Sequence, residues 1–318
     1  MNILGIDIAK KKFDVYLQRD DQSQQNVFSN NPDGFNQLQA WLEQQGVTEL
    51  HACMEATGIY YEALAEYLVQ QGYTVSVVNP WQIKAYADSK LRRHKTDRLD
   101  ARLIADFCLK EQPRAWQPLT PAERTLQALV RHLDSLVNTR QQQLNRLESS
   151  RDDLVTASLE RLMAQLSAEI QQVKQLIQDH LDQHPVLKRK QELLASIPGI
   201  GEQTATALLA EMPDLAQYPS AKHAAADAGL TPVERTSGSS VRGQPHLSKI
   251  GNPRVRKLLY FPALAAMRYN PFIQALRQRL LERGKAKMVV VGAAMRKLLH
   301  LAYGVLKHNT PFDPAYAN

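Results

Sequence analysis

Hydrophobic and polar positions follow two different periods along the chain, and the change of period predicts how the chain is organised. In the first hundred or so residues, four short apolar runs predict strands at 3–8, 13–17, 50–55 and 74–78. Three helical patterns accompany them, at 35–45, 61–71 and 97–110. Asn79 and Pro80 are expected to end the last strand. Strands that alternate with helices predict an α/β sheet covered by helices.

The middle of the chain is predicted to be helical. Pro113, Pro118 and Pro121 mark a boundary, after which residues 122–181 contain neither proline nor glycine. Apolar residues recur there at steps of three and four, which predicts two long helices that pair with each other or with another subunit. The polar stretch 149–158 is expected to separate the two helices.

The last third is also predicted to be helical. Around residues 197–201, a short helical pattern, a turn with two glycines and another helix predict a helix-hairpin-helix. Gly199 and Gly201 would expose backbone N–H groups to a phosphate there. Further helices are expected at 255–267 and 288–306. The predicted division is an α/β domain over 1–115, a helical coiled-coil region over 116–190 and an α-helical domain over 191–318.

Bulk composition restricts the class of protein. The 318 residues are 44% hydrophobic and 22% charged, which is ordinary for a soluble globular protein. Two cysteines are too few for a disulfide framework or a zinc cluster. No apolar run is expected to span a bilayer. The N-terminus lacks the order of a secretory signal, because lysines follow its apolar run. We therefore expect a cytoplasmic protein without a membrane partner.

Positive charge is concentrated in one stretch of the sequence. Residues 235–307 contain fifteen Lys or Arg and one acidic residue, a formal charge of +14. The whole chain carries +7, so the remainder carries −7. Such asymmetry predicts binding to a polyanion, because each neutralised phosphate releases condensed counterions. The candidate phosphate contacts, for which a role in solubility is the alternative, are Lys249, Arg254, Arg256 and Lys257.

A loop rich in glycine and serine lies inside this basic stretch. Its sequence from 237 to 243 is Ser-Gly-Ser-Ser-Val-Arg-Gly. A hydroxyl there could attack a phosphodiester and conserve the bond energy in a phosphoserine, while Arg242 stabilises charge on the phosphorus oxygens. The residues do not choose among Ser237, Ser239 and Ser240. A flexible linker is the alternative interpretation of the same composition.

Four carboxylates in the first part of the chain are candidate metal ligands. Asp7 lies inside an apolar strand, where a buried unpaired acid is costly. Glu55 ends another strand, and Asp97 and Asp100 share one face of a helix's first turn. Together they can hold two divalent cations for phosphoryl transfer, in a strand–strand–helix order that suits a ribonuclease-H-like fold. Singly, each has a structural alternative, such as complementing the helix macrodipole.

A basic connector precedes the helical pair of acids. Its cations include Arg92, Arg93, Lys95 and Arg98. Their position beside the predicted metal site favours contacts with a DNA or RNA backbone over a merely solvated charge run. Tyr86 is expected to pack rather than to stack on a base. Asp14 and Asp106 are expected to be solvated or structural.

Five separated motifs occur in an order that resembles one family. They are Ile6-Asp7 with Lys10, Glu55-Ala56-Thr57-Gly58, Lys95-Thr96-Asp97-x-x-Asp100-Ala101, Ile197-Pro198-Gly199-Ile200-Gly201 and Ser237-Gly238-Ser239-Ser240-Val241-Arg242-Gly243. Through them, essentially the whole chain resembles the IS-one-ten-type insertion-sequence transposases, which are also described as bridge-RNA-guided recombinases. The motif positions show no departure from the family pattern.

The resemblance implies a RuvC-like N-terminal domain of ribonuclease-H fold with a metal site for Mg²⁺ formed by Asp7, Glu55, Asp97 and Asp100. It implies a coiled-coil middle and a C-terminal transposase domain in which Ser237, the first serine of the loop, is the nucleophile. It also implies a structured RNA that pairs with target and donor DNA. Dimers would form a tetramer, whose composite sites combine the acids of one protomer with the serine of another.

We therefore expect a site-specific DNA recombinase that cleaves, exchanges and religates strands through a phosphoserine. The alternative is a metal-dependent nuclease resembling a junction resolvase, in which the serine loop only touches phosphate. A non-enzymatic RNA- or DNA-binding scaffold is the least favoured hypothesis, because it leaves the four acids without a role. Target and donor sequences would be specified by the RNA rather than by residues of the protein.

Overall fold

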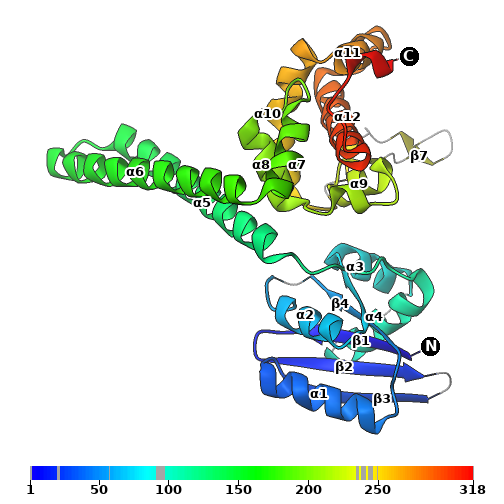
Figure 1. Ribbon diagram of the computed structural model, residues 1–318. Coiled ribbons are helices and arrows are strands. Elements are labelled where there is room, and N and C mark those ends of the chain that lie inside the picture. Colours follow the sequence, from blue (N-terminus) through cyan, green and yellow to red (C-terminus); the bar gives the residue numbers. More distant parts are fainter. Residues whose placement is uncertain are drawn as a thin grey trace. The chain divides into compact units, whose positions relative to one another are not determined.

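The chain forms two compact units, Met1–Pro118 and Leu119–Asn318, here called the N-terminal and the C-terminal unit. The computed structural model describes residues 2–19, 22–56, 58–90, 97–233, 236–237, 241–242, 246–248 and 250–317. Figure 1 shows a sheet with helices in the N-terminal unit and an almost wholly helical C-terminal unit. The mixed α/β first part and the mostly helical remainder therefore agree with the prediction.

A five-stranded sheet forms the centre of the N-terminal unit (Figure 1). Its strands are β1 (Asn2–Ile8), β2 (Lys12–Arg19), β3 (Gln22–Ser29), β4 (Leu50–Glu55) and β5 (Thr74–Val78), in the order β3-β2-β1-β4-β5. β2 pairs antiparallel with both β1 and β3, whereas β1, β4 and β5 run parallel. The central strands β1 and β4 are buried on both faces, so both faces of the sheet are covered.

Helices cover both faces of this sheet. They are α1 (Pro32–Gln44), α2 (Glu62–Gln70), α3 (Pro80–Ser89) and α4 (Asp97–Glu111). Leu4 and Ile6 of β1 share a core with α1 and α2, whereas Ile3 shares the opposite core with α3 and α4. α4 lies so close to β1 that a Cβ on Gly5 would be 2.0 Å from the carbonyl oxygen of Ala101. Glycine at this position therefore permits the contact that places α4 on the sheet.

Two long helices, α5 (Pro121–Ser149) and α6 (Asp153–Gln183), begin the C-terminal unit and pack against each other (Figure 1). A capping box of Thr120 and Glu123 starts α5, and the side chain of Asp152 caps α6. The break between the helices is residues 150–152, which is shorter than the predicted 149–158. Of the two pairings that the pattern allowed, the structure contains the one within the chain.

In the described part of the C-terminal unit, six further helices follow. They are α7 (Pro185–Ala195), α8 (Glu202–Glu211), α9 (Ala221–Asp227), α10 (Pro253–Tyr269), α11 (Pro271–Glu282) and α12 (Lys287–His308), with short 3-10 turns at Leu215–Gln217 and Pro314–Ala317. By length and composition alone, α12 is the single helix among the described residues that could cross a membrane. Leu298, Leu299 and Ala302 of α12 are fully buried in the core of the unit, which accounts for its hydropathy.

The segment that contains the predicted serine loop is formed by very short strands. β6 (Pro232–Val233) pairs with β9 (His246–Leu247), and β7 (Thr236–Ser237) pairs with β8 (Val241–Arg242). We call residues 232–247 the serine segment. The backbone N–H of Ser248 donates to the carbonyl of Thr231 at 2.9 Å and extends the outer pair. The two ends of the serine segment therefore leave the helical core side by side.

The sequence pattern did not predict β3, α3, α9 and α11, or the short strands β6 to β9 of the serine segment. β3 is an edge strand in which only Phe28 is buried, so it lacks the apolar alternation of the other strands. Pro80 does follow the end of β5, but it also begins α3, because the side chain of Asn79 caps that helix. Proline at the first position of a helix loses no hydrogen bond, so the same residue can end one element and begin the next.

Candidate active site and nucleic-acid interface

Asp7 and Glu55 lie at the carboxyl ends of two neighbouring parallel strands. The register pairs Ile6 of β1 with Met54 of β4, so the next residue along each strand places Asp7 beside Glu55. Both residues are half-buried. They point to the face covered by α4, as Gly5 does, because side chains alternate along a strand. The sheet therefore brings together two of the four predicted acids.

The first turn of α4 lies toward the same end of the sheet. Ala101, near the start of α4, contacts the position of Gly5 in β1. Cys108, toward the end of α4, hydrogen-bonds with His51, which lies two residues before the β4 partner of Gly5. α4 thus runs opposite in direction to β1 and β4. Its first turn, which includes Asp100, is directed to the strand ends where the other two acids lie.

The chemistry of these side chains fits a hard cation. Asp100 is half-buried, whereas the side chain of Asp97 lies outside the described residues. Carboxylate oxygens are the ligands that Mg²⁺ prefers, usually one or two of them together with waters and substrate phosphates. Among the side chains that the structure describes, no three His, Cys, Asp or Glu form a metal-binding group. A complete set would therefore need Asp97 or a shift of the described acids.

Asp14 is a buried neighbour of Asp7, which the sequence did not predict. The two residues are directly opposed in the β1–β2 register. Asp14 is only 6% exposed, and its carboxylate pairs with Lys12 Nζ at 3.1 Å. Of the two roles expected for Asp14, solvated or structural, the structure supports the structural one. The apolar neighbours Phe13 and Val15 were the available signal, because they show that this strand is buried.

Asp106 has a structural role, as expected. Its carboxylate accepts a hydrogen bond from the Tyr86 hydroxyl at 2.8 Å and pairs with Lys110 at 2.9 Å. Burial alone would raise the pKa of Asp106, but the bonds from Lys110 and Tyr86 lower that pKa below its ordinary value. Tyr86 also packs edge-on against Phe107 at 5.4 Å. These contacts fasten α3 to α4, and they support the prediction that Tyr86 packs.

Ser237 is the last residue of β7, where it pairs with Val241, and Arg242 pairs with Thr236. The strands therefore place the backbones of Ser237 and Arg242 close together at the start of the serine loop. The side chains of both residues lie outside the described part of the chain. The same is true of the side chain of Arg98 and of four further predicted residues, Arg92, Arg93, Lys95 and Lys249.

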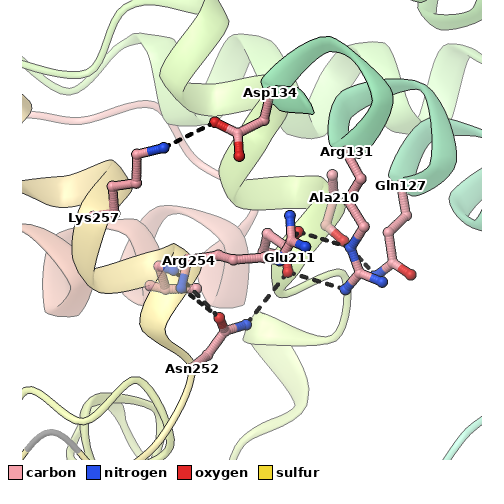
Figure 2. Close-up of polar contacts among 9 residues, drawn as sticks. Gln127, Arg131, Asp134, Ala210, Glu211, Asn252, Arg254 and Lys257 are labelled. Carbon is pink, nitrogen blue, oxygen red and sulfur yellow. Dashed lines mark hydrogen bonds and ion pairs between the residues drawn. The ribbon is translucent and has the colours of Figure 1, made fainter. Parts of the chain in front are cut away.

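Arg254 and Lys257 lie in the first turns of α10, close to acids of the same unit (Figure 2). Glu211, the last residue of α8, has a side chain that is 6% exposed and accepts bonds from Arg131 of α5 at 3.0 and 3.1 Å. Arg254 Nε lies 4.0 Å from Glu211, and Lys257 Nζ lies 3.1 Å from Asp134 of α5. Both basic side chains remain more than half exposed, so a phosphate could still reach them.

Asn252 fastens the end of the serine segment to the helical core. Its side-chain oxygen caps α10 by accepting from Arg254 N at 2.9 Å, and its amide donates to Glu211 at 3.4 Å (Figure 2). Its backbone N–H donates to the carbonyl of Asp227 in α9 at 2.8 Å. The preceding Gly251 has a φ of +135°, and a Cβ there would be 2.1 Å from the same carbonyl. This anchor fixes where the chain leaves the serine segment.

Arg256 and Gly199 have packing contacts that were not predicted. Arg256 Nη1 donates to the carbonyls of Ala228 and Gly251 at 3.3 and 3.1 Å, and burial lowers the pKa of its guanidinium. Gly199 has a φ of +105°, and a Cβ there would be 2.6 Å from the Cβ of Ala266 in α10. A Cβ on Gly201, which precedes α8, would have no heavy atom of the described residues within 4 Å apart from those of its two chain neighbours. Of the two glycines, Gly201 is the more open to a ligand.

Comparison with known proteins gives the class of this chain. Residues 4–156 match a family described as a transposase, and residues 191–278 match the transposase IS116/IS110/IS902 family. A pilin gene-inverting protein of Moraxella bovis is 37% identical over 320 residues, which cover 98% of this chain and 97% of the relative. The transposase of insertion sequence element IS1111A from Coxiella burnetii is 25% identical over 309 residues, which cover 85% of this chain and 79% of that protein.

The α/β unit with paired acids, the basic helical unit and these matches define an enzyme of the DNA recombinase and transposase class. The chain belongs to the IS116/IS110/IS902 family of transposases. This confirms the family that the five sequence motifs resemble.

Proposed function

We propose that this protein moves or inverts DNA segments through the combined action of Ser237 and the acids Asp7, Glu55, Asp97 and Asp100. The observation that carries the proposal is the 37% identity, over 98% of the chain, with a protein named for inverting a pilin gene. The placement of Asp7 beside Glu55 supports a joint role for the acids. We further propose that the N-terminal unit is RuvC-like and that the α7–α8 turn is a helix-hairpin-helix.

The proposed cleavage step is an attack by serine on DNA. The Oγ of Ser237 forms a bond with phosphorus while the bond from phosphorus to the 3′ oxygen breaks. The proton of the serine hydroxyl passes, in net terms, to the leaving 3′ oxygen. Arg242 would stabilise the charge on the non-bridging oxygens. Because the phosphoserine conserves the energy of the phosphodiester, a 3′-hydroxyl from another strand can reverse the step and complete strand exchange.

The acids would hold Mg²⁺, which when bound stabilises charge on the attacking and leaving oxygens. Support for this assignment comes from the oxygen-donor chemistry of Asp7, Glu55 and Asp100 and from their direction toward one end of the sheet. The neighbouring Asp14, already paired with Lys12, would keep Asp7 in an acidic environment.

We also propose that a structured RNA pairs with the target and donor DNA, and that dimers of the protein form a tetramer. The family resemblance implies both properties. The formal charge of +14 over residues 235–307 exceeds what a few contacts at one cleavage point would need, which supports a second nucleic acid.

The test uses purified protein with its RNA and a DNA substrate that contains a nick opposite the cleavage point, so that a covalent adduct accumulates. The unaltered protein should give a protein–DNA adduct that survives denaturation, and Ser237→Ala should give none. Ser239→Ala and Ser240→Ala are the matched controls from the same loop and should retain the adduct. Hydrolysed DNA without an adduct from Ser237→Ala would instead establish a metal-dependent nuclease.

The metal assignment is tested separately. Asp7→Asn and chelation of divalent cations should each abolish adduct formation while leaving binding of the DNA substrate intact, and added Mg²⁺ should restore the activity of the chelated protein only. Adduct formation at an undiminished rate after chelation would contradict the role of the acids. It would leave the role of the serine standing.

A further inference from the structure

A pocket lies between α11 and α12 of the C-terminal unit, and none of its residues belongs to the motifs considered above. It is lined by Pro271, Phe272, Ala275, Leu276, Arg279 and Lys297, and its volume is ≈ 450 Å³. This volume lies within the range of pockets that bind small molecules and cofactors, about 300 to 1,000 Å³. The pocket is therefore large enough for one nucleotide.

One wall of the pocket is apolar and aromatic. Phe272 and Leu276 belong to successive turns of α11 and are half-buried. The ring of Phe272 packs edge-on against the ring of Phe312, with 5.4 Å between the two centroids, and this contact restrains it. Phe312 is in turn fixed to the core, because its backbone N–H donates to the Ser196 hydroxyl at 2.8 Å. A fixed, partly exposed ring is suited to stacking with a planar group.

The rest of the pocket is cationic. Lys297 Nζ lies 5.6 Å from the centroid of the Phe272 ring, and Arg279 is exposed at the rim. Within the described part of the chain, neither side chain forms an ion pair with a carboxylate. The two charges are therefore available to an anion.

The surroundings add to the positive potential. Burial and the charges of Arg296, Lys297 and Lys222 lower the pKa of the half-buried His300, which indicates an excess of positive charge around α12. Beyond Arg279, the exposed turn between α11 and α12 continues with Arg283, Lys285 and Lys287. Its one acid, Glu282, accepts a bond from Gln278 at 2.8 Å. Cations thus extend from the pocket along the turn.

We propose that this pocket binds an unpaired nucleotide of the DNA substrate, with the base against Phe272 and Leu276 and the adjoining phosphates on Arg279 and Lys297. An apolar wall beside two free cations fits a ligand that is aromatic at one end and anionic at the other. Stacking of bases on aromatic rings, together with a basic track for the backbone, is how proteins bind single strands without reading sequence. A duplex exposes its phosphates but not its base faces.

This inference rests on the proposed function, because strand exchange creates unpaired DNA between cleavage and religation. The ammonium of Lys297 would leave the ring of Phe272 when a base binds and would contact the neighbouring phosphate. The exposed cations of the α11–α12 turn would then bind the strand on the other side of the nucleotide. The pocket would hold a freed strand end without taking part in the chemical step.

The test compares the binding of two fluorescein-labelled probes to the full-length protein. One is a short oligothymidylate, and the other is an oligonucleotide of equal length with abasic sites. Phe272→Leu keeps the apolar volume but removes the aromatic face. It should weaken binding of oligothymidylate by roughly 5- to 100-fold and leave binding of the abasic strand unchanged. Arg279→Gln should weaken both and should reduce the slope of log affinity against log salt by about 0.7.

The controls separate this pocket from general effects. Arg151→Gln removes an exposed cation between α5 and α6 and should change neither probe. The proposal would be overturned if Phe272→Leu weakened binding of both probes equally or of neither. Thermal unfolding shows whether Phe272→Leu is misfolded. If it is, the binding of the two probes by Arg279→Gln decides whether the proposal holds. A dependence on Phe272 with oligouridylate but not with oligothymidylate would assign the pocket to RNA instead. Binding is measured without cleavage, so its outcome is independent of whether Ser237 forms an adduct.

Discussion

The two groups of candidate catalytic side chains are held in place in different ways. In the N-terminal unit, Asp7 and Glu55 belong to regular strands, and the strand register alone places them side by side. In the C-terminal unit, Ser237 belongs to a two-residue strand in a segment that is fastened to the helical core near its ends. The acids thus depend on how the sheet packs against α4, whereas the serine depends on polar anchors at the base of its segment.

The largest expected effect comes from breaking the anchor of the serine segment. Glu211→Ala removes the buried carboxylate that accepts from Arg131 and Asn252. It should lower the free energy of unfolding by about 3–5 kcal/mol, because three hydrogen bonds to one buried carboxylate, each worth about 1.5–3 kcal/mol, are lost together. Urea unfolding of the full-length protein measures this change.

The matched control is Glu192→Ala, which removes an exposed carboxylate 3.8 Å from Arg189. It should cost less than about 1 kcal/mol. Under conditions in which Glu211→Ala remains folded, adduct formation by Ser237 should also fall, since Asn252 loses one of the contacts that hold the end of the segment. Similar losses of stability in the two variants would show that Glu211 is not an anchor.

The second prediction concerns the packing behind the acids. Gly5→Ala places a Cβ 2.0 Å from the carbonyl oxygen of Ala101, so α4 must move away from β1. The expected cost is about 3 kcal/mol of unfolding free energy, the upper part of the usual range for overpacking. Because α4 also carries Asp100, activity should fall even where the variant remains folded.

Gly201→Ala is the control for this substitution, because a Cβ at this position would contact none of the described residues beyond its two chain neighbours. Its unfolding free energy should change by less than about 1 kcal/mol. Circular dichroism and urea unfolding of the two variants test the contrast. Equal tolerance of both substitutions would mean that the close contact between β1 and α4 is not required.

The sequence pattern predicts the central strands and misses the edge for one physical reason. β1 and β4 are buried on both faces, so they appear as apolar runs. β3 is paired on one side only and buries Phe28 alone, so its hydrogen bonds to β2 hold it in the sheet with little contribution from burial. Backbone pairing leaves no trace in the pattern of side chains.

The candidate site, like the sheet, was predictable only in part from the sequence. Asp7 and Glu55 stood out individually as acids in apolar strands, but their adjacency is a matter of register between segments that are distant in sequence. Arg256 was predicted to contact phosphate because of its charge. Its acceptors are the backbone carbonyls of Ala228 and Gly251, which no side-chain pattern reveals. Residue types indicated the chemistry, and long-range backbone contacts determined which groups meet.

A smaller effect is expected from the basic residues that follow the serine segment. Lys257→Ala removes an exposed ion pair with Asp134, so stability should change by less than about 1 kcal/mol. If Lys257 contacts a phosphate, duplex DNA binding should weaken for all sequences alike, and the salt slope should fall by about one. Lys188→Ala, which removes an ion pair with Asp182 on the α6–α7 side of the unit, is the control. An unchanged salt slope for Lys257→Ala would show that Lys257 only pairs with Asp134 and does not contact a phosphate.

The smallest expected effect comes from the contact between α3 and α4, and it depends on pH. The pKa of Asp106 in the folded protein lies below its ordinary value of 3.8, despite burial, because Lys110 and Tyr86 donate to the carboxylate. Such a group stabilises the protein at pH values above 3.8 and ceases to do so as the pH falls through the folded pKa. Asp106→Asn should therefore cost about 0.5 kcal/mol of unfolding free energy at neutral pH.

The difference from the unaltered protein should vanish in acid, as urea unfolding at a series of pH values would show. A cost for Asp106→Asn that persists at the lowest pH would mean that packing, rather than charge, joins the two helices.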